Sequence, residues 1–107
     1  MIPMKSIVNL FDQLNWEKAD NYPEGTFKKT LRDEDGAKTI LLRLPAGFNM
    51  QPHSHITTEQ NLVLSGSFTY NGKTYPEGSY QIFQAHEEHG PFYSKDGAMV
   101  LVIWDSY

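Results

Sequence analysis

Hydrophobic and polar residues alternate over several short runs of this chain, which is the pattern of a β-strand with one buried face. The runs are rich in β-branched and aromatic residues, which favour strands. The clearest of them cover residues 39–44, 61–70, 79–83 and 98–104. The pattern therefore predicts a protein built mainly from short β-strands.

Turn signals separate these runs at short and fairly even intervals. Asn71-Gly72 is the pair typical of a two-residue type I′ hairpin turn, and Gly and Pro recur too often along the chain for long helices. Only residues 8–16 predict a short helix, because Leu14 follows Leu10 and Phe11 by helical spacing. Many short strands with hairpin turns indicate an all-β fold, an antiparallel sandwich or barrel with a ligand site in its mouth.

Size and composition narrow the classes of protein to which the chain can belong. Its 107 residues and 12.3 kDa predict one domain over residues 1–107, and 39% hydrophobic with 21% charged residues is typical of a folded chain. The net charge is −4 and the Lys and Arg residues are scattered, so we expect no nucleic-acid partner. No apolar run approaches the roughly 20 residues of a membrane helix, so we expect no membrane partner.

Two further absences in the sequence shape the expected chemistry and location. The chain has no cysteine, which removes disulfides, thiolate catalysis and Cys-ligated metals. The first 20 residues show no apolar segment of a secretory signal. We therefore expect a cytoplasmic protein.

All four histidines fall within one third of the chain, and three of them have a spacing that suits a metal site. His53 and His55 lie two residues apart, so on a strand their imidazoles point to the same face. Glu59 follows four residues later, which gives it that face too on an unbroken strand. His89 comes after another strand and turn, where a neighbouring strand would bring it to the same place.

Three neutral imidazoles and one carboxylate suit Fe(II), Mn(II), Ni(II), Cu(II) or Zn(II). Such a site keeps a net positive charge, which attracts an anionic or enolised substrate. Four protein ligands leave up to two positions of an octahedral shell for water, dioxygen or substrate. The alternative for each residue alone is ordinary, namely a His pair in a surface turn after Pro52 and a solvated carboxylate.

The spacing of these residues resembles the first sequence motif of the cupins. Gly47, five residues, His53-Ser54-His55, three residues, Glu59, six residues and Gly66 match that motif at all five fixed positions. The resemblance implies that the two glycines are turn residues. It also implies the cupin fold, a double-stranded β-helix or jelly-roll barrel.

The second cupin motif is matched in part. Gly78 and His89 occupy the positions of its first glycine and its histidine. Gln84, His86 and Tyr93 replace its usual Pro, Gly and Asn. The ligand histidine is kept, while the turn chemistry before it is changed.

Within the cupins, residues 44–47 and 61–66 look most like the cupin domain of the ChrR type, which is the metal-binding half of an anti-sigma factor. The chain also resembles small cupins that cleave acetylacetone as dioxygenases. Those bind iron through three histidines and lack the glutamate, so Glu59 counts against transferring their activity to this chain.

The resemblance implies that His53, His55, Glu59 and His89 hold one divalent transition metal ion, Fe, Mn, Ni or Zn. Cupins of this size commonly pair into dimers. Apolar residues on both faces of the strand expected at 39–44 fit such a pairing, so we expect a homodimer formed through the outer sheet.

Three more residues are candidates for contacts with the metal ligands or with substrate. Arg43 lies in an otherwise apolar strand, where it either holds a substrate carboxylate or extends to solvent. His86 is either a proton shuttle near the mouth or an exposed loop residue beside two glutamates. Tyr93 is one of several candidate proton donors, and nothing in the sequence selects among them.

Two classes of function follow for a small-molecule ligand. The first is a metal-dependent enzyme that acts on a small carbonyl, enol or hydroxy-acid substrate by dioxygenase- or isomerase-type chemistry, and it needs an accessible pocket beside the metal. The second is a non-catalytic module that binds or senses a small molecule, like the ChrR cupin domain, and it tolerates a closed site. The 107 residues include no helical domain to hold a sigma factor, which favours a small-molecule role over an anti-sigma role.

Overall fold

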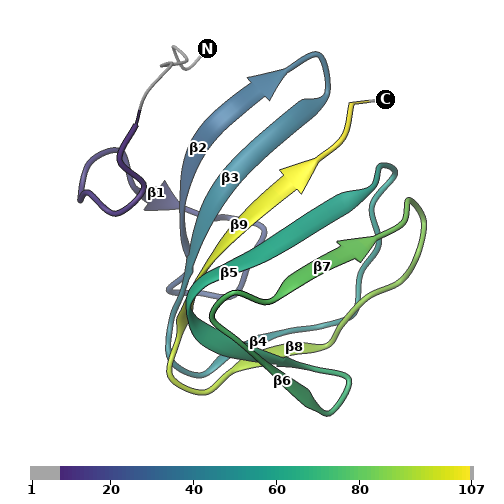
Figure 1. The fold of residues 1–107 in the computed structure, drawn as a ribbon. Helices are drawn as coiled ribbons and strands as arrows, with labels where there is room; N and C mark the ends of the chain where they lie inside the picture. Colours follow the sequence, from purple (N-terminus) through teal and green to yellow (C-terminus); the bar gives the residue numbers. More distant parts are fainter. Residues whose placement is uncertain (1–7, 107) are drawn as a thin grey trace.

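The computed structural model describes residues 8–106, which form β-strands and turns and no helix (Figure 1). No helix in this part of the chain is long and apolar enough to cross a membrane. The strands are β1 (Glu17–Lys18), β2 (Phe27–Glu34), β3 (Ala37–Leu44), β4 (Phe48–Met50), β5 (Glu59–Tyr70), β6 (Lys73–Pro76), β7 (Tyr80–Phe83), β8 (Phe92–Ser94) and β9 (Ala98–Trp104).

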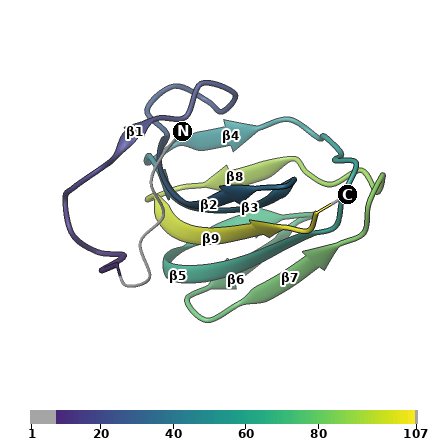
Figure 2. The same ribbon diagram turned by 90° about the horizontal axis from the view of Figure 1, so that it is seen from above.

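These strands form a curled antiparallel sheet in the order β1-β2-β3-β9-β5-β8-β4, with β6 and β7 also paired to β5. The first half of β5 pairs with β7 and β9, and its second half pairs with β6 and β8. Figure 1 shows the result, with β4, β6 and β8 gathered at one end of the longer strands, and Figure 2 shows the curl from above. The fold is therefore a half-barrel in which β5 belongs to both walls.

A glycine makes the bend of β5 sterically feasible. The register between β5 and β9 shifts between Val63 and Ser65, and Gly66 follows with a φ of 73°. A Cβ atom at Gly66 would lie 2.8 Å from the Cα atom of Ala98, which is too close for any side chain. The glycine of the first cupin motif thus lets two strands approach where the sheet turns.

The hydrophobic core fills the concave side of the sheet. Alternate residues of β3 and β9 point inward, which explains why Ile40, Leu42, Val100 and Val102 are all buried. Aromatic side chains from β4, β5, β7 and β8 complete this cluster, namely Phe48, Phe68, Phe83 and Phe92.

The strand and hairpin predictions are confirmed. The four expected runs correspond to β3, β5, β7 and β9, each with ends within two residues of the prediction. Asn71 and Gly72 both have positive φ, 53° and 77°, as a type I′ turn requires, and they join β5 to β6. The hydrophobic pattern did not single out β2, because charged residues fill much of its sequence.

The short helix expected over residues 8–16 does not form, and the segment makes turns instead. The side chains of Asn9 and Asp12 accept hydrogen bonds from the backbone N–H groups of Phe11 and Leu14, at 2.9 and 3.0 Å. Such local bonds compete with helical hydrogen bonds. Phe11 and Leu14 are 58% and 66% exposed, so the apolar spacing that suggested a helix covers no core.

Candidate metal centre

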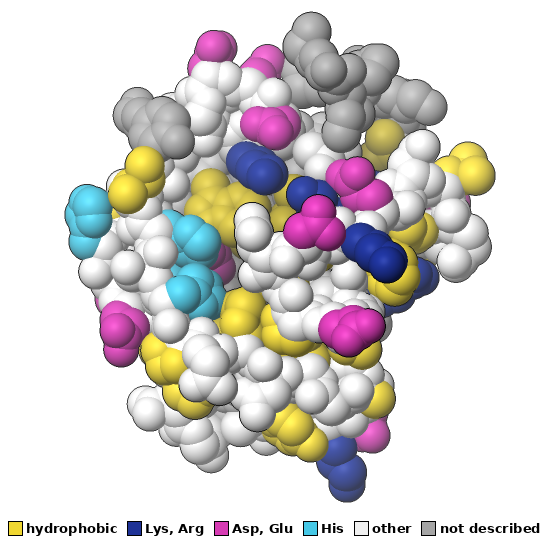
Figure 3. Space-filling model, turned by 180° about the vertical axis from the view of Figure 1, so that it is seen from behind, with side chains coloured by type: hydrophobic (Ala, Val, Ile, Leu, Met, Phe, Trp, Pro, Cys, Tyr) yellow, Lys and Arg dark blue, Asp and Glu magenta, His cyan; other side chains and the backbone are white. Residues whose placement is uncertain are grey.

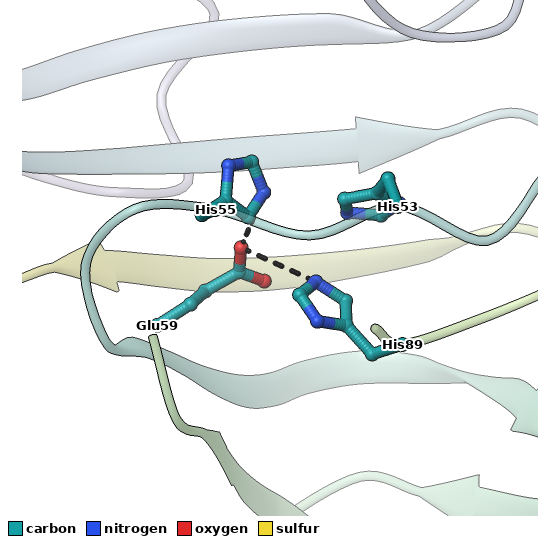
Figure 4. Close-up of side chains that lie close together, drawn as sticks. All are labelled: His53, His55, Glu59 and His89. Atoms are coloured by element: carbon teal, nitrogen blue, oxygen red, sulfur yellow. Dashed lines mark ion pairs between the residues drawn. The ribbon is translucent and has the colours of Figure 1, made fainter. Parts of the chain in front are cut away.

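The four residues of the expected metal site come together at one end of the half-barrel (Figure 4). His53 and His55 lie in the connection between β4 and β5, Glu59 is the first residue of β5, and His89 lies in the connection between β7 and β8. Their ligand atoms all lie within 4.8 Å of one another. Two ligands on opposite sides of a metal ion at about 2.1 Å each lie about 4.2 Å apart, so this spacing is close to that of a coordination shell.

Backbone hydrogen bonds fix the two loops that carry the histidines. The N–H of His53 donates to the carbonyl of His89 at 2.9 Å, and the N–H of His89 donates back at 2.8 Å. The N–H of His86 donates to the carbonyl of His55 at 2.7 Å. Each histidine ligand on these loops is therefore held through the main chain as well as by its ring contacts.

The ring orientations of two histidines leave the Nε2 atom free to bind a metal. Nδ1 of His53 lies 3.2 Å from the carbonyl oxygen of Gln51, and Nδ1 of His89 lies 3.2 Å from that of Glu87. A carbonyl oxygen only accepts, so Nδ1 carries a proton in both rings and Nε2 is the ring nitrogen left to face a metal ion. Hydrogen bonds of this kind orient metal-binding histidines in many proteins.

The site contains buried polar atoms that a cation would satisfy. Among the described residues, Nε2 of His55 and Nε2 of His89 are buried and have no hydrogen bond of acceptable geometry. They lie 2.9 and 3.7 Å from Oε1 of Glu59, at ion-pair distances. A buried polar group left without a partner costs about 1–3 kcal/mol. These donors fit a divalent transition metal ion, which would supply a Lewis acid at this point when bound.

Electrostatics keep the carboxylate charged and one imidazole neutral. Burial alone would raise the pKa of Glu59, but the close approach of the His55 and His89 imidazoles outweighs it and lowers the pKa to about 2. Burial lowers the pKa of His53. Burial also opposes the charge on His89, but Glu59, with a smaller contribution from Glu87, raises its pKa. A carboxylate and a neutral imidazole are the forms that bind a metal ion.

Trp104 supports the site, although its alternation with Val100 and Val102 indicates only a core residue. Its indole Nε1 donates to Oε1 of Glu59 at 2.9 Å, and its ring lies 5.6 Å from that of His55. The register explains the contact, because Trp104 of β9 is the direct cross-strand partner of Glu59. The sequence contained a signal for this role, because Trp104 alternates with Val100 and Val102 and therefore faces inward at the end of a buried strand.

An open cavity of about 700 Å³ adjoins the histidines. His53 and His55 form part of its wall, and Figure 3 shows histidine side chains at the rim of a hollow with an apolar floor. Tyr22, from the loop after β1, also lines the cavity, and nothing in the sequence marked it. Burial, and secondarily the charge of Glu59, raises the pKa of Tyr22 well above its usual value, so its hydroxyl stays protonated.

The structure places the other three sequence candidates away from the four ligand atoms. Arg43 lies on the face of β3 opposite the core, with its guanidinium 4.6 Å from the ring centroid of Trp16. His86 is exposed with a φ of 67° and reaches the site only through its backbone bond to His55. Tyr93 of β8 is 43% exposed, between two buried neighbours that face inward.

Comparison with solved structures shows the same fold in other proteins. An acetylacetone dioxygenase from Acinetobacter johnsonii matches with a TM-score of 0.78 and 16% identity over 97% of this chain and 76% of that one. The anti-sigma factor ChrR of Rhodobacter sphaeroides, in complex with SigE, matches with a TM-score of 0.74 and 24% identity over 89% of this chain and 51% of that one. An RmlC-like cupin from Ralstonia eutropha matches with a TM-score of 0.72 and 22% identity over 85% of this chain and 62% of that one. At these identities the matches show the fold, and this chain spans about half of the ChrR chain.

The family follows from the sequence itself. A search among curated proteins finds no significant match. The model of the ChrR cupin-like domain family matches residues 4–106. The resemblance to cupins that the two motifs indicated is thus confirmed, and so is the all-β cupin fold. Because the match covers nearly the whole sequence, this chain belongs to the ChrR cupin-like domain family.

Proposed function

We propose that this protein is a divalent-metal-dependent enzyme that acts on a small carbonyl, enol or hydroxy-acid substrate by dioxygenase- or isomerase-type chemistry. The observation that supports this most is the cavity of about 700 Å³ beside His53 and His55. A site that only holds a metal needs no such space. A small substrate, by contrast, needs room next to the open coordination positions.

Two of the four candidate ligands are buried and the other two are partly exposed. Glu59 and His89 are 5% and 1% exposed, and they lie against the barrel core. His53 and His55 are partly exposed and face the cavity. A substrate entering from the cavity would therefore meet the metal from the His53 and His55 side, with the neutral hydroxyl of Tyr22 on the cavity wall as a hydrogen-bond donor.

A non-catalytic binding or sensing module is the second candidate function. The family match favours it, since the family is described by the cupin-like domain of ChrR, and ChrR forms a complex with SigE. Such a module would bind a small molecule at the same metal without converting it. Turnover, measured after metal content is known, distinguishes the two candidates.

The first experiment is elemental analysis of protein purified without added metal. We expect about one Fe, Mn, Ni or Zn per chain, strongly reduced in His53→Ala and Glu59→Ala. His86→Ala is the matched control, because its imidazole is exposed and outside the ligand group, and it should keep its metal. No metal in the wild type, before or after reconstitution, would refute a metal-dependent function.

The second experiment measures turnover by the metal-loaded protein. Oxygen uptake and product formation are followed with acetylacetone and with small oxo and hydroxy acids, with and without air. Conversion that disappears in Glu59→Ala supports the enzyme. Tight binding of a small molecule with no conversion would support the sensing module instead.

The outer sheet suggests how two copies would associate, and we propose a homodimer through it. Tyr80 and Ile82 of β7 are 55% and 49% exposed on this face, next to half-buried Leu62 and Leu101. Light scattering after size-exclusion chromatography should give a dimer at micromolar concentration, and Ile82→Asp should give a monomer. Ile56→Asp, at an exposed site elsewhere, is the control. A monomeric wild type would end this proposal.

A further inference from the structure

Two lysines share the cavity with the metal-binding histidines. Lys28 of β2 and Lys38 of β3 both line it, opposite the loop that carries His53 and His55. Figure 3 shows Lys and Arg side chains gathered across the hollow from the histidines. Neither lysine belongs to the expected metal site, and neither was singled out by the sequence pattern.

The register of the sheet explains how Lys38 comes to face the metal ligands. Lys38 is the cross-strand partner of Trp104, and Trp104 is the partner of Glu59, so the three side chains stand on the same face in one row. Adjacent strands lie about 4.8 Å apart, which puts the Cα atoms of Lys38 and Glu59 about 10 Å from each other. The ammonium of Lys38 lies 5.9 Å from the ring centroid of Trp104, so this side chain leans along the row.

Neither of the two lysines forms an ion pair within the described part of the chain. Both side chains are half-buried, and within residues 8–106 neither has an ion pair or a side-chain hydrogen bond. The neighbouring Lys29 is a contrast, because it points to the other face of β2 and pairs with Asp12 at 2.7 Å. Among the described residues that line the cavity, Asp20 is the acidic one, and the buried carboxylate of Glu59 lies behind the histidines. Glu17 and Asp33, the exposed cross-strand partners of the two lysines, form no ion pair with them in this part of the chain, so both ammonium groups are available to an anionic ligand.

We propose that the ligand of this site is an anion, a small carbonyl or hydroxy compound whose carboxylate is bound by Lys28 and Lys38 while its carbonyl or hydroxyl oxygens face the metal centre. The inference rests on the proposed function and specifies its substrate class. A partly desolvated ammonium group binds a charged oxygen more strongly than a neutral one, because the hydrogen bond between them is charge-assisted. The cavity has room for such a molecule between the lysines and the histidines.

The test compares two ligands that differ by one charge. In 2,4-dioxopentanoate, a carboxylate replaces one terminal methyl group of neutral acetylacetone. Calorimetric titration uses the zinc-loaded protein, because zinc is not redox-active and the ligands stay intact. We expect the anion to bind at least about tenfold more tightly than acetylacetone, with a difference that shrinks at high salt.

Variants then assign the preference to the two lysines. Lys28→Met and Lys38→Met should each weaken binding of the anion by about three- to fivefold, and the double variant by about tenfold or more. Affinity for acetylacetone should change little, and Lys73→Met, in the distant β6 hairpin, should change neither ligand. Zinc content and melting temperature of each variant show that the site and fold are intact.

Equal affinities for the two ligands, absence of binding by the anion, or an unaltered preference in the double variant would each overturn the inference. In those cases the metal content of the wild type would still support the proposed function. Failure of the wild type to hold metal would instead overturn the proposed function.

Discussion

His53 and His89 lie directly opposite each other and exchange two backbone hydrogen bonds, although they belong to different loops. Their ring centroids are 4.3 Å apart. Two of the four candidate ligands are therefore positioned by the main chain before a metal arrives. Glu59 is placed independently, because it begins a strand that is paired on both sides.

The close approach of these loops predicts a specific effect of Gly90→Ala. Gly90 has a φ of 113°, and a Cβ atom there would lie 2.9 Å from the Cα of Pro52, next to His53. We expect the variant to push the two loops apart, which would destabilise the fold by about 2 kcal/mol or more and weaken zinc binding at least about tenfold. Thermal melting and zinc titration measure both effects.

Gly78→Ala is the matched control for this substitution. Gly78 also has a positive φ, 88°, but no atom lies within 4 Å of an added Cβ. Its free energy of unfolding should fall by only about 1–2 kcal/mol, the cost of a positive φ at a residue with a side chain. Its zinc affinity should equal that of the wild type. Equal zinc affinities in the two variants would contradict the role of the loop contact.

The indole of Trp104 predicts a loss of metal affinity on removal of a single hydrogen bond. Trp104→Phe keeps the packing of an aromatic ring but removes the donor to Oε1 of Glu59. Partners of this kind typically contribute ten- to a hundredfold to metal affinity, so we expect a loss of about tenfold. Trp16→Phe is the control, because its Nε1 donates to the carbonyl of Asp12 at a distance from the site. Similar zinc affinities in both variants would show that the Glu59 contact has no such role.

The sequence was informative about the ligand group, but the strand argument behind it was only partly right. His53 and His55 were expected on one face of a continuous strand with Glu59. In the structure β5 begins at Glu59, and the histidines precede it in an irregular loop. The four residues meet because the His53–His89 bridge brings two loops together. The cupin motif contained that information, whereas local periodicity did not.

The cavity wall was beyond prediction from local pattern. Lys28 and Lys38 face the histidines only because β3 pairs with β2 on one side and with β9 on the other in the curled sheet. Tyr22 reaches the cavity from a loop near the start of the chain. Such placements depend on pairings between distant segments, and two lysines in strands otherwise look like exposed charges. Turn and strand signals are local, which explains why they were predictable.

The pKa of Glu59 predicts an acid-sensitive stability of the metal-free protein. The folded value is about 2 and the ordinary value is 4.5, so the folded state is favoured above pH 4.5 and this advantage is lost as the pH falls toward 2. Its size is on the order of 3 kcal/mol. His89 acts in the opposite sense, because its raised pKa stabilises the fold below pH 6.5 and the effect disappears as the pH rises through the folded value.

Urea unfolding of the metal-free protein between pH 2.5 and 6 measures this effect. Glu59→Gln cannot ionise, so its stability should fall less steeply with acid than that of the wild type. Glu77→Gln, in an exposed turn, should keep the wild-type slope. Parallel curves for all three proteins would mean that the pairing of Glu59 with the histidines does not contribute to stability.

Metal removal should lower the melting temperature, because a metal held by side chains from separate loops binds the folded chain and not the unfolded one. A metal at a hundred times its dissociation constant adds about 2.7 kcal/mol, which for a chain of this size corresponds to a shift on the order of 10 °C. A chelator should abolish that shift in the wild type.

His55→Ala loses the ligand atom at 2.9 Å from Glu59, so its melting temperature should be the same with and without chelator. His86→Ala should respond to the chelator as the wild type does, since only the backbone of this residue contacts the site. If the chelator shifts the melting of His55→Ala as much as that of the wild type, the stabilising metal is bound somewhere other than at this group of residues.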